Sequence, residues 1–201
     1  MKVPFFDRSQ KIWVGPLGII AFVVFYMIPN HVNVFTPSLL PMFGFEKALP
    51  FMGWTVWIYL SDYLYIAVAF ILLSDKSNMN KIYYSQLMLL FASMFLFFLF
   101  PTTYPRPEVE YVGLTGIFLN MLHSADTPGN ACPSIHVAMT FLAGFGFIKE
   151  KRNFFYFFMV WAVLISLSTL TVKQHYVLDV IGGFFMSVIF YYIGQKLIKD
   201  N

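Results

Sequence analysis

The chain has 201 residues, of which 59% are hydrophobic and only 11% are charged, whereas soluble domains are usually about a quarter charged. Its formal net charge of +3 is scattered between long apolar runs, so no nucleic-acid-binding surface is indicated. The single cysteine, Cys132, excludes an internal disulfide. Composition therefore predicts a membrane protein rather than a soluble domain.

Apolar segments follow one another along the chain, and a helix needs about 20 mostly apolar residues to cross a bilayer. Six segments are candidates, of which the fourth is short: 12–29, 54–73, 82–101, 134–148, 153–172 and 176–197. The first is interpreted as a retained span, because no small-residue cleavage site follows it. Segment 111–123 is too short to cross and is expected to lie at the interface or to re-enter. We therefore expect an all-α integral membrane protein of six transmembrane helices, with this short helix between spans three and four, and a single domain over residues 1–201.

Lys and Arg are distributed unevenly over the predicted loops. Ten of the 13 lie in the N-terminal segment, in the second and fourth loops and at the C-terminus. Cytoplasmic loops carry the excess of these residues. Both termini are therefore predicted to be cytoplasmic, and the odd-numbered loops to face the periplasm, lumen or exterior.

Polar side chains gather at the cation-poor end of the predicted spans. They are Arg106, Ser134, His136, Lys173, His175 and Asp179. Because the chain alternates in direction, these residues are expected on one membrane face. Ionisable groups near hydrocarbon are costly unless they meet each other, water or a ligand, so the cluster indicates a site.

The types and spacing of these residues favour phosphoryl transfer. His175 and Asp179 are four apart on a predicted helix, so the carboxylate can hold one imidazole nitrogen and leave the other as a nucleophile. His136 begins another helix, where Ser134 and free N–H groups suit a phosphate oxygen. Arg106 supplies positive charge, and Lys173 adds more. These cations would repel a metal ion, so neither a metal nor another cofactor is expected.

Three short motifs carry a family resemblance. PSIH (Pro133 to His136), YPRP (Tyr104 to Pro107) and STLTVKQHYVLD (Ser168 to Asp179) resemble, in order and spacing, the motifs of the type 2 phosphatidic acid phosphatase (PAP2) superfamily. Its members include six-helix lipid phosphatases and lipid phosphotransferases. The resemblance covers roughly residues 100–185 directly.

The resemblance implies a role for each matching residue. His175 would attack phosphorus to form a phosphohistidine, Asp179 would orient it, and His136 would protonate the leaving oxygen. Arg106 and Ser134 match phosphate-binding positions, and Ser168, which opens the third motif, is included among the substrate-binding residues.

The chain also departs from the family pattern. Leu99 and Thr169 stand where the family usually has cations, and Lys173 is our candidate to replace one of them. Ile135 replaces a common Gly, which, with HYVLDVIGG, looks closer to the inositol-phosphorylceramide and sphingomyelin synthase branch.

The expected function is a lipid phosphate phosphatase acting at the extracytoplasmic face on an anionic phospholipid or a prenyl phosphate. One alternative is a headgroup phosphotransferase. Another is a non-enzymatic lipid-binding or transport protein, whose pathway would include Asp62 inside the second span. Asp62 is expected to pair with Arg106 or Lys173 or to face a water-filled cleft. Tyr59 is interpreted as an aromatic-belt residue, Gly182 and Gly183 as positions of close helix packing, and no oligomeric state is predicted.

Overall fold

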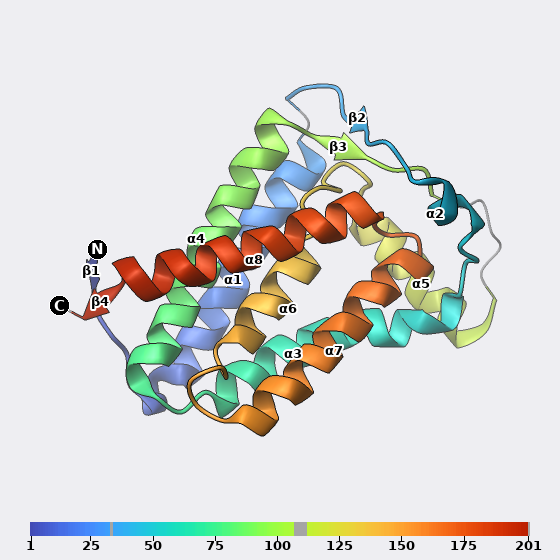
Figure 1. The fold of residues 1–201 in the computed structure, drawn as a ribbon. Coiled ribbons are helices and arrows are strands. Elements are labelled where there is room, and N and C mark those ends of the chain that lie inside the picture. The colour runs from blue at the N-terminus through green and yellow to red at the C-terminus, as the bar shows by residue number, and fades with distance from the viewer. Residues whose placement is uncertain (33, 107–111, 201) are drawn as a thin grey trace.

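The computed structural model describes residues 1–32, 34–106 and 112–200, and nearly all of its regular structure is helical (Figure 1). The helices are α1 Lys11–His31, α2 Gly44–Ala48, α3 Val56–Leu72, α4 Lys76–Leu99, α5 Gly113–Ala125, α6 Ile135–Phe145, α7 Arg152–Thr171 and α8 Val177–Leu197, with 3-10 turns at Arg8–Gln10 and Gly53–Thr55. Two parallel pairs of two-residue strands tie distant segments: β1 Lys2–Val3 with β4 Lys199–Asp200, and β2 Ser38–Leu39 with β3 Thr102–Thr103. The predicted all-α class is confirmed.

Five helical segments within the described residues are long and apolar enough to cross a membrane. They are Arg8–His31, Gly53–Leu72, Lys76–Leu99, Arg152–Thr171 and Val177–Leu197. These segments correspond to five of the six predicted spans and identify the chain as an integral membrane protein. The remaining segment is the fourth predicted span, 134–148. It forms the 11-residue helix α6, which extends roughly 16 Å, whereas the hydrocarbon core is about 30 Å thick. Six spans are therefore not confirmed.

Helix α6 is enclosed by other parts of the protein. Its residues from Ile135 to Gly144 are all buried, and it packs against α3, α4, α7 and α8. In Figure 1 it lies in the middle of the molecule, behind α8. A helix that is apolar on every side belongs to a core, and irregular backbone at its ends is tolerated where other protein covers it. The apolar composition of segment 134–148 thus reflects burial by helices rather than a match to lipid thickness.

Two glycines of α8 permit its close contact with α6. A Cβ atom added to Gly183 would lie 2.4 Å from the carbonyl oxygen of Ser134, and one added to Gly182 would lie 3.3 Å from Cys132 Sγ. Small residues let helix backbones approach in this way. This is the close packing predicted for the glycine pair, and it brings the start of α6 against the first turns of α8.

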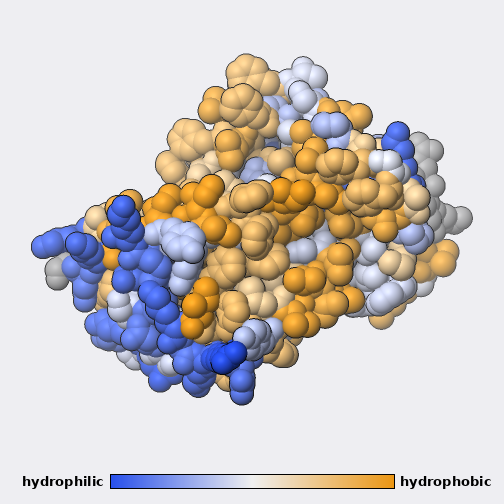
Figure 2. All heavy atoms as spheres, in the orientation of Figure 1, coloured by the Kyte–Doolittle hydropathy of each residue, from blue (hydrophilic) through white to orange (hydrophobic). Residues whose placement is uncertain are grey.

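Hydrophilic residues gather at the end of the molecule that carries both termini, and an apolar surface covers its middle (Figure 2). Lys76, Lys81, Lys149 and Lys199 line two adjoining polar clefts there. Lys11 donates from Nζ to three carbonyl oxygens at the end of α3. Much of the positive charge of the chain is therefore concentrated at this end, away from the histidines described below.

Segment 111–123, predicted as an interfacial or re-entrant helix, corresponds to α5, Gly113–Ala125. Tyr111 lies outside the described residues. Helix α5 packs beside α3 and the Gly53–Thr55 turn. Its relation to the membrane stays a prediction.

Candidate active site

Two histidines from different helices meet where α6 and α8 begin. His136 lies in the first turn of α6 and His175 lies two residues before α8. Their ring centroids are 5.9 Å apart, and the residues are only 5% and 6% exposed. The two helix starts are also joined directly, because Ser134 N donates to Asp179 O at 2.9 Å. The structure thus brings together side chains that the topology was expected to place on one face.

The turn between α7 and α8 presents His175. Its backbone N–H and that of Gln174 both donate to the carbonyl oxygen of Thr169, at 3.1 and 3.0 Å. Lys173 adopts a left-handed backbone conformation with φ 57°, which is uncommon for a residue with a side chain. The chain reverses tightly here, and the reversal aims His175 toward the start of α6.

Asp179 holds one nitrogen of His175. The distance from His175 Nδ1 to Asp179 Oδ2 is 3.4 Å, and the same oxygen accepts a 2.8 Å hydrogen bond from Tyr176 N. At this distance the two groups form an ion-pair contact and not a hydrogen bond, since Nδ1 has no hydrogen-bond partner among the described residues. Catalytic hydrogen bonds are often long without substrate. The pairing expected from the i, i+4 spacing is present as this contact, and Nε2 of His175 takes no part in it.

Ser134 is the N-cap of α6 and is fully buried. Its hydroxyl oxygen accepts from Val137 N at 3.5 Å, a long contact. The N-terminus of a helix carries partial positive charge and favours an anion. Ser134 and His136 begin the same helix, so a hydroxyl and a helix start lie at the place where the two imidazoles meet.

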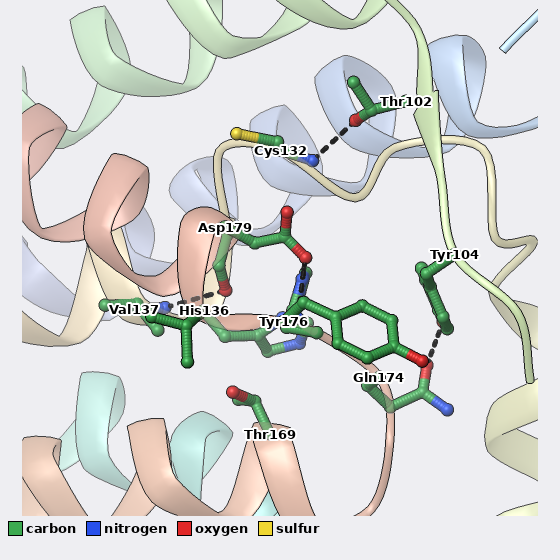
Figure 3. A network of polar contacts seen from close by, with 12 residues as sticks. Thr102, Tyr104, Cys132, His136, Val137, Thr169, Gln174, Tyr176 and Asp179 are labelled. Atoms are coloured by element: carbon green, nitrogen blue, oxygen red, sulfur yellow. Dashed lines mark hydrogen bonds and ion pairs between the residues drawn. The ribbon is translucent and has the colours of Figure 1, made fainter. Parts of the chain in front are cut away.

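Arg106 lies over the ring of Tyr104, whose centroid is 6.4 Å from that of His175, and its guanidinium is held by backbone carbonyls. Its guanidinium donates to the carbonyl oxygen of His123 at 3.0 Å and to that of Asp126. It also donates to the Tyr104 hydroxyl at 3.2 and 3.3 Å. The Tyr104 hydroxyl in turn donates to Gln174 Oε1 at 2.7 Å (Figure 3). Arg106 is thus connected to the residue that precedes His175.

The C-terminal end of α5, which carries these carbonyls, is anchored to α1 through its C-cap Asp126. Asp126 Oδ1 accepts from Tyr26 Oη at 2.5 Å and from Asn30 Nδ2 at 2.9 Å. Burial raises the pKa of the Asp126 carboxyl, while the bond from Tyr26 and the nearby positive charges oppose the rise. Burial, and after it Arg106, lowers the pKa of His123 to about 4. The first helix therefore positions Arg106 indirectly, through the C-terminal end of α5.

The loop after α5 leads to Cys132, whose N–H donates to Thr102 Oγ1 at 2.7 Å (Figure 3). Burial raises the pKa of the Cys132 thiol to about 11, and Asp179 adds to the rise. The thiol is thus kept protonated. Pro107, the last residue of the YPRP motif, lies outside the described residues.

Lys173 and Ser168 have hydrogen bonds that lead away from the histidines. Lys173 Nζ donates to the carbonyl oxygen of Glu46 in α2 at 3.1 Å, and burial lowers the pKa of its ammonium group. Ser168 Oγ donates to Ile165 O of its own helix at 2.6 Å. Neither contact shows the residue as a phosphate ligand, so both assignments stay predictions. Thr169, at a position where the family usually has a cation, instead shapes the turn before His175 through its carbonyl oxygen.

Asp62 is buried in α3, and its expected ion pair is not found. Within residues 1–32, 34–106 and 112–200, the ion pairs are Lys76 with Asp7 and His175 with Asp179. Oδ1 of Asp62 has no hydrogen-bond partner there. Pairing with Arg106 or Lys173 is therefore wrong for this structure. Across the same described residues, no group of three or more His, Cys, Asp or Glu side chains is placed to hold a metal ion.

Tyr59 is the functional candidate that sequence interpretation placed wrongly. It is 1% exposed, not part of an aromatic belt, and its Oη lies 2.9 Å from His136 Nε2. The signal that was available is the spacing of the buried residues of α3, which are Val56, Tyr59, Asp62, Tyr65 and Ala69. Steps of three and four residues mark one helix face turned toward the core.

The comparisons with known proteins agree with this geometry. A family model described as the PAP2 superfamily matches residues 34–193, a range that contains both histidines, Asp179, Ser134 and Arg106. A search of curated proteins found no match. Membership of this family suggests a phosphatase-type activity on phosphate esters of lipids. Because the match covers most of the chain, the protein belongs to the PAP2 superfamily.

Proposed function

We propose that this protein is a membrane lipid phosphate phosphatase that works through a phosphohistidine and needs no metal. The observation that carries the proposal is the meeting of His136 and His175 at 5.9 Å between ring centroids, with Asp179 behind His175. A nucleophile, a group that orients it and a proton donor are what a metal-independent displacement at phosphorus requires.

The proposed reaction has two steps. In the first, the Nε2 lone pair of His175 forms a bond to phosphorus while the bond from phosphorus to the ester oxygen breaks, and His136 gives its proton to that oxygen. In the second, water attacks the phosphohistidine, His136 takes a proton from it, and the bond to Nε2 breaks. Asp179, whose Oδ2 lies 3.4 Å from Nδ1, would accept a hydrogen bond from Nδ1–H once substrate draws the two groups together, so that the correct tautomer of His175 is retained.

Phosphate binding is assigned to the groups around the histidines. The Ser134 hydroxyl and the start of α6 would bind one phosphate oxygen. Arg106 would bind another, with N–H groups that now donate to the carbonyl oxygens of His123 and Asp126 and would turn to the phosphate. Lys173 and Ser168 are proposed as outer substrate-binding residues, and in this role Lys173 would leave Glu46. The proposed substrates are an anionic phospholipid or a prenyl phosphate.

We also propose the arrangement in the membrane. The concentration of Lys residues at the end with both termini supports a cytoplasmic location of that end, with the histidines opening toward the periplasm, lumen or exterior. Helix α6 would count as a sixth, shortened crossing inside the bundle, α5 would lie at the interface or re-enter, and residues 1–201 would form one domain.

One observation favours a second candidate function. His136 and His175 are nearly enclosed, and Ile135, where the family often has Gly, is buried beside them. An enclosed site restricts water and favours a lipid hydroxyl as the acceptor. The alternative is therefore transfer of a phosphorylated headgroup to a second lipid, as in the inositol-phosphorylceramide and sphingomyelin synthase branch.

The test is turnover by purified protein in mixed micelles with a panel of lipid phosphates. Phosphate release that persists in chelator, together with an acid-labile phosphoenzyme that His175→Ala abolishes, is the expected result. His31→Ala is the control, because this exposed histidine ends α1 and its ring contacts Met27 O of the same helix. Headgroup exchange without phosphate release would establish the transferase instead. Full activity in His175→Ala would refute the mechanism.

A further inference from the structure

The ring of His136 is held by a residue from another helix. Tyr59 of α3 places its hydroxyl oxygen 2.9 Å from Nε2 and 3.5 Å from Nδ1 of His136. The ring centroids are 4.7 Å apart and tilted by 43°. Both residues are almost wholly buried. The contact therefore lies inside the protein, where water does not compete for it.

A tyrosine hydroxyl at Nε2 determines which nitrogen of His136 can exchange a proton with the substrate. The hydroxyl is both a donor and an acceptor. Because Nε2 faces Tyr59, His136 would give and regain its proton at Nδ1, and Nε2–H would donate to the Tyr59 hydroxyl oxygen in both the protonated and the neutral ring. Buried polar groups left without a partner are costly, so this acceptor matters at an enclosed imidazole.

We propose that Tyr59 is the positioning residue for His136, whose ring it holds in one place while the ring gives and regains its proton. This inference rests on the proposed phosphatase function and adds a residue that the family motifs do not contain. Tyr59 itself does not touch the phosphate. Its contribution is confined to the steps in which His136 transfers a proton.

Because Tyr59 acts only through proton transfer by His136, its effect on the rate should depend on whether the leaving group needs a proton. An alkyl phosphate needs a proton on its departing oxygen, whereas a nitrophenyl phosphate releases a stable phenolate without one. Tyr59→Phe keeps the ring and removes the hydroxyl. We expect kcat for phosphatidic acid to fall about tenfold with little change in KM, the loss of one buried hydrogen bond. We expect the rate with nitrophenyl phosphate to stay within about twofold, since His136 is less needed there.

Tyr65→Phe is the matched control. Tyr65 lies on the same face of α3, is fully buried, and donates to Phe158 O at 3.2 Å, away from the histidines. Both variants remove one buried hydroxyl from α3, so comparable thermal midpoints will show that both fold. Tyr65→Phe should leave the ratio of the two substrates unchanged.

The pH profile gives a second readout. Without the hydroxyl, protonated His136 loses an acceptor, so the activity of Tyr59→Phe on phosphatidic acid should begin to fall at a lower pH than in the wild type. The double variant Tyr59→Phe with His136→Ala should be no slower than His136→Ala alone, because the two residues act as one unit.

The outcomes separate two failures. Equal slowing of both substrates by Tyr59→Phe, or no slowing of either with an unmoved pH profile, would overturn the role of Tyr59 and leave an active phosphatase. A wild-type protein that turns over neither substrate, or a His175→Ala variant that retains turnover, would instead overturn the proposed function, and the inference about Tyr59 would fall with it.

Discussion

Replacement of Gly183 by alanine would press α8 away from the start of α6. The added Cβ would lie 2.4 Å from the Ser134 carbonyl oxygen and 3.1 Å from Val137 Cβ. The carbonyl cannot rotate aside, because it accepts the first helical hydrogen bond of α6 from Ala138 N at 3.0 Å. The two backbones must therefore separate by about 0.6 Å merely to reach 3.0 Å, and real Cβ contacts closer than that are essentially never seen.

This displacement enters the site directly, since Ser134 begins α6 and Asp179 lies in the first turn of α8. A misplacement of about 1 Å can cost on the order of 100-fold in rate. Overpacking costs about 1–3 kcal/mol, and the better helix propensity of alanine offsets up to about 1 kcal/mol of that loss. We therefore expect Gly183→Ala to fold with a modestly lower thermal midpoint and to lose between tenfold and about 100-fold in kcat/KM for a lipid phosphate.

Two other glycines provide controls. A Cβ at Gly194, near the far end of α8, would lie 1.7 Å from Ser85 Oγ, so Gly194→Ala overpacks the same helix away from the histidines. A Cβ at Gly15 of α1 would make an ordinary 3.5 Å contact with Phe70. Gly194→Ala should lose stability more than activity, and Gly15→Ala should lose neither. Normal turnover in Gly183→Ala, or an equal activity loss in Gly194→Ala, would refute the reasoning.

Three further predictions concern the chemistry and topology of the loops. The pKa of about 11 at Cys132 leaves little thiolate at pH 8. Alkylation of this thiol should therefore be far slower than that of an exposed thiol and should accelerate up to about pH 11. Fast labelling at pH 8 would contradict the burial of Cys132. Slow labelling of Cys132 permits a topology test with introduced cysteines. Ser124→Cys should react with an impermeant reagent from outside, and Ser77→Cys should react only after lysis. The reverse pattern would show that the proposed orientation is inverted. Because the pKa of His123 is lowered from 6.5 to about 4, its contribution to stability is present above about pH 6.5 and is lost as the pH falls toward 4. The thermal midpoint of His123→Asn should fall less over that interval than that of the wild type, and parallel curves would exclude the contribution.

The local sequence pattern was sufficient to predict several features of the structure. The spacing of His175 and Asp179 determines that their side chains share a side of the chain, and the structure places Nδ1 and Oδ2 3.4 Å apart. Apolar runs of about 20 residues likewise predicted the five long helices, because the cost of leaving backbone groups unpaired in lipid makes length and composition decisive. Family motifs could be identified from residues 104–107, 133–136 and 168–179 alone.

Other features depend on which helix lies beside which. An apolar segment looks the same whether lipid or protein surrounds it, so the reduction of segment 134–148 to the 11-residue helix α6 was not visible in its composition. The bond of Lys173 to Glu46 joins positions 127 residues apart, and no local pattern contains it.

The sequence by itself determined a membrane protein with phosphate-handling motifs and a paired His175 and Asp179, because these properties arise within one segment at a time. Only the tertiary structure decided that Tyr59, 77 residues from His136, is the neighbour of that ring, and that Arg106 is held by carbonyl oxygens at the C-terminal end of α5. The physical reason is that hydrogen bonds between helices depend on packing at the crossing points, such as the approach of α8 at Gly183. That packing is a property of the assembled bundle.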